Sequence, residues 1–162
     1  MYATRKFLNH FKTFNIPQKF NIDVGVLKRN YIKLQQEYHP DVGVSEEKSA
    51  EISTGYNILK KPIERGLYLV KLTNPDKTLE ELPSPSDIEF LMTIMELNEE
   101  MSQLKTKVEY NDFKSKLLKT QSELLSGIEV AFEENNIDTA YELLAQLKYF
   151  ESLNTRLLDI DL

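Results

Sequence analysis

The sequence has no cysteine and only two histidines, His10 and His39, in 162 residues. Without thiols it cannot form disulfides or the thiolate sites that hold structural zinc, and two histidines this far apart offer no ligand cluster. A glycine-rich phosphate loop is also missing, and no nucleophile stands at a workable spacing from a base. We therefore expect no metal site and no catalytic residues.

Long hydrophobic runs and an excess of positive charge are missing as well. No stretch approaches the roughly 18 consecutive apolar residues that a membrane-spanning helix needs. The chain carries 20 lysines and arginines against 26 aspartates and glutamates, a formal net charge of -6, so it lacks the electrostatic footprint of a general nucleic-acid binder. We expect neither a membrane nor a nucleic acid as a partner.

Acidic residues are missing from the amino terminus, where the first one is Asp23. The basic residues before it are Arg5, Lys6, Lys12 and Lys19. This bias is typical of an organelle transit segment. The alternative is a basic first helix whose apolar face consists of Phe7, Leu8, Phe11 and Phe14. The two interpretations are compatible if only the first few residues are removed.

The sequence does contain clear helix periodicity in its first half. Leu27, Tyr31, Leu34 and Tyr38 form one stripe of an amphipathic helix that begins near Asp23 and ends by His39, because Pro40 cannot continue it. Ile52, Tyr56 and Leu59 form a second stripe, with Ser45 as a plausible N-cap. Pro62 suits the first turn of a short helix through Leu72.

Three prolines in "TNPDKTLEELPSPS", residues 73–86, indicate an elbow between two domains. Ser86 and Glu89 make a capping box for the next helix. Two more helices follow, at about 108–134 and 138–158, separated by Asn135 and Asn136. We predict an all-α protein with an N-terminal helical domain at 1–75, a linker at 76–86 and a C-terminal three-helix bundle at 87–162.

The first bundle helix has more apolar residues than one core needs. Its core seam is expected to comprise Phe90, Ile94, Leu97, Met101, Leu104 and Val108. A second stripe away from that seam comprises Ile88, Leu91, Met92 and Met95, continued by Glu99. On the last helix the core stripe is Ala140, Leu143, Leu144, Leu147 and Phe150, and Tyr149 is expected to point nearly opposite. The second stripe either binds a partner or packs against a neighbouring part of the same chain.

The stretch "QQEYHPDVGV", residues 35–44, places His39, Pro40 and Asp41 in a loop between two helices. Loops held by a scaffold often carry recognition residues. The simpler interpretation is that Pro40 only ends the helix, His39 is incidental and Asp41 makes a local turn. From these three residues alone the simpler interpretation is favoured.

The order of these sequence features favours a recognition role for His39, Pro40 and Asp41. A helix with Arg29 and Lys33 opposite its apolar stripe, then His-Pro-Asp, then a helix with a buried tyrosine, resembles the J domain of DnaJ-type co-chaperones. The segments "ERGLYLVKL" (64–72), "FLMTIMELNEEM" (90–101) and "YELLAQLKYFESL" (141–153) resemble the HscB family, which is specialised for iron-sulfur cluster assembly. Val42 and "ISTGY" (52–56) depart from the family pattern, and a helical Gly55 costs up to about 1 kcal/mol relative to alanine.

The resemblance implies two protein partners. His39, Pro40 and Asp41 would engage the ATPase side of a DnaK-type chaperone and stimulate its ATP hydrolysis. The complementary positive face would comprise Lys28, Arg29 and Lys33, although such cations also suit a merely solvated helix face. The surface for the iron-sulfur cluster scaffold protein would comprise Leu91, Met92, Met95, Glu96, Glu99 and Tyr149.

We therefore expect a co-chaperone that delivers the iron-sulfur scaffold protein to a dedicated chaperone. Such a protein is not an enzyme, because the ATP hydrolysis belongs to its partner, and it needs no cofactor, because the cluster sits on the scaffold protein. The alternatives are a J-domain protein with a different client and a helical adaptor that does not act on an ATPase. "GLYLVKL" and "IMELNEEM" look closer to eukaryotic members, which favours the mitochondrial matrix or a mitochondrion-derived organelle over a bacterial cytoplasm.

Overall fold

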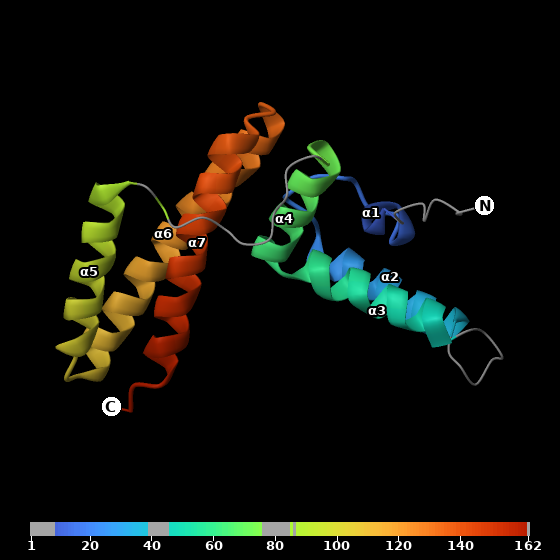
Figure 1. Cartoon of the computed structure of the whole chain (residues 1–162). Helices are drawn as coiled ribbons and strands as arrows, with labels where there is room; N and C mark the ends of the chain where they lie inside the picture. Colours follow the sequence, from blue (N-terminus) through green and yellow to red (C-terminus); the bar gives the residue numbers. More distant parts are fainter. Residues whose placement is uncertain (1–8, 39–45, 76–84, 86, 162) are drawn as a thin grey trace. The chain divides into compact units, whose positions relative to one another are not determined.

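The computed structural model describes residues 9–38, 46–75, 85 and 87–161. Every regular element in these ranges is an α-helix, which confirms the all-α prediction (Figure 1). The chain divides into two compact units, Met1–Leu72 and Thr73–Leu162. Thr73 is the first residue of the proline-containing segment 73–86, so each unit is described by itself below.

The N-terminal unit contains α1 (His10–Thr13), α2 (Val24–Glu37), α3 (Glu46–Lys60) and α4 (Pro62–Thr73). Asp23 is the N-cap of α2, as predicted, and its Oδ1 accepts a hydrogen bond from the Val26 N–H at 3.0 Å. The predicted helix from Pro62 is also confirmed. Of the residues considered for the amino terminus, Phe11 and Phe14 are buried, so the chain belongs to the folded unit by this point.

Helices α2 and α3 form an antiparallel hairpin. Tyr31 on α2 stacks on Tyr56 on α3, with ring centroids 4.1 Å apart. One turn later on α2, Gln35 Nε2 donates to Ser53 Oγ at 2.8 Å and to the Ser49 carbonyl at 3.3 Å. Because α3 residues of decreasing number meet α2 residues of increasing number, the chains run in opposite directions. These contacts fix the rotation of α2 about its own axis.

Arg65 on α4 is a buried charge that the sequence patterns did not indicate. Its side chain is 6% exposed, and Nε donates to the Phe20 carbonyl at 2.7 Å while Nη1 donates to the Leu59 carbonyl at 2.6 Å. The second acceptor belongs to the last turn of α3, whose carbonyls have no partner within the helix. Burial lowers the pKa of Arg65 to about 10, so the guanidinium is still charged at neutral pH.

Gly55 on α3 is required by a close approach of α1. A Cβ at this position would lie 2.7 Å from His10 Nδ1 and 3.2 Å from Phe14 Cε2. The expected propensity cost of this glycine thus has a structural reason, because a side chain here would displace the His10 ring and the buried Phe14. His10 in turn stacks on Tyr68 at 4.8 Å, and its backbone N–H donates to the Tyr68 hydroxyl at 3.0 Å.

The C-terminal unit contains α5 (Ile88–Ser102), α6 (Lys107–Glu133) and α7 (Ile137–Leu158). Asn135, in the left-handed region with φ 56°, reverses the chain after α6, and the Asn136 side chain then caps α7. The two asparagines thus separate the helices as predicted. The buried cluster comprises Ile94, Leu97, Met101, Phe113, Leu117, Phe150, Leu153 and Leu157.

Helix starts in this unit differ from two predictions. Asp87 is the N-cap of α5, with its Oδ1 accepting from the Glu89 N–H at 2.9 Å, whereas Ser86 lies outside the described residues. A capping box instead opens α6, where Thr106 and Glu109 each accept a backbone hydrogen bond from the other. The predicted core seam is confirmed from Phe90 to Leu104 and is wrong at Val108, because α5 ends at Ser102 and Val108 is 70% exposed on the next helix.

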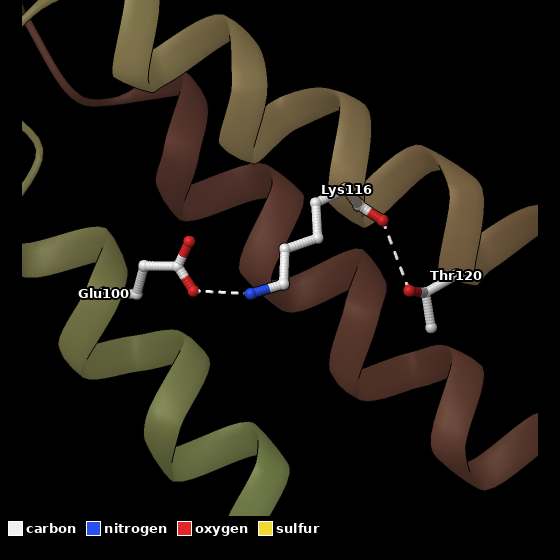
Figure 2. A network of polar contacts seen from close by, with 3 residues as sticks. All are labelled: Glu100, Lys116 and Thr120. Atoms are coloured by element: carbon white, nitrogen blue, oxygen red, sulfur yellow. Dashed lines mark hydrogen bonds and ion pairs between the residues drawn. The ribbon is translucent and has the colours of Figure 1, made fainter.

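An exposed ion pair links α5 to α6. Lys116 Nζ donates to Glu100 Oε2 at 2.6 Å, and the Thr120 hydroxyl donates to the Lys116 carbonyl one turn along (Figure 2). About half of each charged side chain is exposed, so the pair contributes at most about 1 kcal/mol to stability. The pair shows that Glu100 lies on the edge of α5 that faces α6.

Candidate functional site

A basic face lies on α2. Lys28, Arg29 and Lys33 are all exposed, and residues 24–36 of this helix include no aspartate or glutamate. The Arg29 guanidinium folds back along the helix, so that a Cβ on Gly25 would lie 3.6 Å from its Nη1. The three cations therefore present positive charge on the outer side of the hairpin, in a chain whose net charge is -6.

The other predicted chaperone-binding residues follow this helix in the sequence. His39, Pro40 and Asp41 lie outside the described residues, and their assignment stays a prediction. The last described residue before them is Tyr38, which caps α2 and lies beneath the Lys48 ammonium at 4.8 Å.

An apolar stripe lies on α5, on the side away from its buried residues. Ile88, Met92 and Met95 are 74%, 57% and 71% exposed, so the three-helix bundle does not cover them. They occupy positions i, i+4 and i+7, and Glu99 continues the line at i+11. Glu96 and Glu99 are exposed, whereas Leu91 is half-buried at the edge of the stripe.

Tyr149 on α7 is placed differently from the prediction. It is half-buried and packs against the bundle core, and its ring makes an edge contact with Phe90 of α5 at 5.9 Å. The expectation that it points away from the core is wrong because α7 packs against both α5 and α6 and is buried on two flanks. Tyr149 therefore lies at the junction of α5 and α7, next to the helix that carries the stripe.

The charge of α5 is uniformly negative. Its sequence includes Glu89, Glu96, Glu99 and Glu100 but no lysine or arginine. Glu100 is paired with Lys116, and Glu99 Oε1 accepts a weak hydrogen bond from Gln103 at 3.5 Å. An apolar stripe with acids at its edge suits a partner surface that is apolar at its centre and basic at its rim.

The described part of the chain offers no group of three or more histidine, cysteine, aspartate or glutamate side chains that could hold a metal ion. Within the same residues, no helix is long and apolar enough to cross a membrane. Each unit has an exposed helix face of one charge sign: the cations of α2 in the N-terminal unit and the glutamates of α5 in the C-terminal unit.

Comparison with known proteins assigns the class. Residues 86–157 match the family model described as the HSCB C-terminal oligomerisation domain. The co-chaperone protein HscB homolog of Acinetobacter baumannii strain SDF is 30% identical over 158 residues, which cover 95% of this chain and 89% of that protein. The human iron-sulfur cluster co-chaperone protein HscB is 28% identical over 161 residues, covering 92% of this chain and 67% of the human one.

Solved structures agree with these relatives. The crystal structure of human co-chaperone protein HscB superposes with a TM-score of 0.82 at 27% identity, covering 96% of this chain and 83% of that one. Chaperone HscB from Vibrio cholerae also gives 0.82 at 24% identity, covering 93% and 96%, and shows the shared fold.

The protein is thus a helical co-chaperone. It belongs to the HscB family, whose named members include an iron-sulfur cluster co-chaperone. The relatives come from bacteria and from humans, so the cellular compartment stays a prediction.

Proposed function

We propose that this chain brings the iron-sulfur cluster scaffold protein to a DnaK-type chaperone and stimulates that chaperone's ATP hydrolysis. The observation that carries the proposal is the exposed stripe of Ile88, Met92 and Met95, which lies in a different unit from the basic hairpin. Two surfaces of opposite charge on separate units allow two partners to bind at once. The cluster is cargo on the scaffold protein, and this chain acts only by binding.

The N-terminal unit is the proposed chaperone-binding part, a J domain. Its α2–α3 hairpin displays Lys28, Arg29 and Lys33, and the His39, Pro40 and Asp41 sequence follows directly after Tyr38 at the end of α2. Cations on such a face attract an acidic surface on the chaperone and speed encounter. The His-Pro-Asp sequence then supplies the contacts that stimulate hydrolysis.

The C-terminal unit is the proposed scaffold-binding part. Met92 and Met95 form its apolar centre, since unbranched thioether side chains adapt to an irregular partner surface. Leu91 and Tyr149 support that centre from the α5–α7 junction, and Glu96 and Glu99 supply its charged edge. The remaining surface contributes mainly by excluding water.

ATP hydrolysis by the purified chaperone, measured with this chain alone, with scaffold alone and with both, tests the proposal. We expect stimulation by this chain, and a further increase when scaffold is present. The matched variant is His39→Gln, which should abolish both effects while the circular dichroism melt is unchanged, because a substitution away from packed groups usually changes stability by less than about 0.5 kcal/mol.

Each failure has its own meaning. Full stimulation by the His39→Gln variant would contradict the J-domain role, and a lowered melting temperature would show that His39 is structural. Stimulation without any response to scaffold would leave a co-chaperone for another client. Scaffold binding without stimulation would leave a helical adaptor.

A further inference from the structure

Helix α2 exposes two branched apolar side chains on the same side as one of its lysines. Val24 is 45% exposed and Ile32 is 46% exposed. With Lys28 they stand at positions i, i+4 and i+8, so the three lie along one side of the helix. We name Val24, Lys28 and Ile32 the α2 strip.

The α2 strip is held outward by contacts on both flanks of the helix. On the α3 flank, Tyr31 stacks on Tyr56 and Gln35 bonds to α3. On the α1 flank, Asn30 Nδ2 donates to the Phe14 carbonyl at 2.7 Å. Rotating α2 to bury Ile32 would break all of these contacts, so the strip is a fixed feature of the folded hairpin (Figure 1 shows α2 and α3 side by side).

The charges around Ile32 restrict what can cover it. Lys28 and Arg29 precede it by one turn, Lys33 follows it directly, and no acid occurs between Val24 and Gln36. A second copy of this chain could not cover the strip with the same face, because like charges would meet. The charge complementarity calls for an apolar side chain that is flanked by carboxylates.

We propose that Ile32 is the apolar centre of the α2 docking face and packs against an apolar side chain of the DnaK-type chaperone that lies between acidic groups. The inference rests on the proposed function and sharpens it, since it gives the basic face a contact that salt does not screen. The cations set the rate of encounter, and burial of Ile32 slows release of the complex. Val24 extends the contact by one turn on the other side of Lys28.

The test is the salt dependence of chaperone affinity for Ile32→Ala and Arg29→Ala. Ile32→Ala should weaken binding about tenfold at every salt concentration, leaving the slope of affinity against salt unchanged, as expected for a lost apolar contact. Arg29→Ala should flatten that slope. Ile32→Met should restore most of the affinity because it returns an apolar side chain of similar volume.

Leu118→Ala is the matched control. Leu118 is 53% exposed on α6 of the other unit, so its truncation removes a comparable amount of exposed apolar surface without touching α2. It should leave chaperone binding unchanged. Circular dichroism melts of all variants should coincide with the parent.

Two results would overturn the inference: an Ile32→Ala variant that binds like the Leu118→Ala control, or one that changes the salt slope as Arg29→Ala does. Failure of the proposed function looks different, because the parent chain itself would then neither bind the chaperone nor stimulate it. If the parent stimulates and Arg29→Ala responds while Ile32→Ala does not, only the role of Ile32 fails.

Discussion

Helices α2 and α5 have nearly the same length, 14 and 15 residues, and opposite surface chemistry. The outer side of α2 carries three cations around two partly exposed branched residues, whereas α5 carries four glutamates beside three strongly exposed apolar residues. Surface charge acts at long range and is screened by salt, while apolar burial acts only on contact. Binding at α2 should therefore depend on salt more strongly than binding at α5.

The strongest loss of binding is expected when the exposed apolar side chains of α5 are truncated, and it should affect scaffold binding alone. Met92→Ala with Met95→Ala should weaken scaffold binding about a hundredfold, since two central apolar contacts are lost and each factor of ten corresponds to about 1.4 kcal/mol. Chaperone stimulation without scaffold should persist. Calorimetric titration with scaffold measures the loss, and Val108→Ala, at an equally exposed site in the same unit, is the control.

Leu91 and Tyr149, the other apolar residues of the expected scaffold surface, are less suitable for that test. Tyr149 packs against Phe90 and the bundle core, and Leu91 is half-buried, so alanine at either position also removes packing within the unit. Their variants should lower the melting temperature as well as scaffold affinity. A melt that matches the parent would mean that both side chains serve the partner alone.

A second expected effect concerns the inner side of the hairpin whose outer side is basic. Gly55→Ala should destabilise the N-terminal unit by about 1–3 kcal/mol, as overpacking of a filled site does. Helix propensity alone predicts the reverse, a gain of up to about 1 kcal/mol. Hydrogen exchange resolved by peptide should show faster opening in α1 and α3 and no change in α6 or α7; slower exchange would favour propensity over packing.

A third, smaller effect reverses the charge of α2. Arg29→Glu with Lys33→Glu should slow chaperone association about tenfold at low salt, equivalent to about 1.4 kcal/mol, and make it nearly independent of salt. Scaffold affinity should be untouched. Stopped-flow association at several salt concentrations gives the result, and loss of both partners together would show that the two faces are not separate sites.

The smallest effect compares the two units by pH. Burial lowers the pKa of His10, an effect partly opposed by the charge of Glu51. Below its ordinary value of 6.5 the unfolded chain therefore binds more protons at His10 than the folded unit does, so the N-terminal unit loses stability as pH falls from 8 to 6. Thr73–Leu162 contains no histidine, and hydrogen exchange there should change less. His10→Gln should remove the difference.

Sequence patterns predicted the helices well because apolar spacing and proline act locally. Asp23 and Pro62 begin α2 and α4 as expected. The missed start of α6 had a local signal too, since Thr106 followed by Glu109 is the pattern of a capping box. Apolar residues continue by chance at a heptad-like spacing as far as Val108, so the spacing alone predicts one uninterrupted seam across the start of α6.

The other differences depend on contacts between distant parts of the chain. Periodicity shows which side of a helix is apolar, but not whether one or two neighbouring helices pack against it. For this reason it predicts the wrong direction for the Tyr149 side chain. From the sequence alone, Gly55 is expected to weaken its helix. The position of His10 next to it explains why a glycine is needed there. Of the predicted partner residues, the structure places Met92 and Met95 on an open surface, while His39, Pro40 and Asp41 stay predictions.

Arg65 ties α4 to Phe20 and to the end of α3 by buried hydrogen bonds that salt in the solvent does not screen. Its two hydrogen bonds end on the carbonyls of Phe20 and Leu59, and a carbonyl neither titrates nor attracts a counterion as a carboxylate does. Salt strong enough to screen the exposed cations of α2 therefore leaves this buried tie in place. We therefore expect salt to weaken chaperone binding at α2 without unfolding the N-terminal unit.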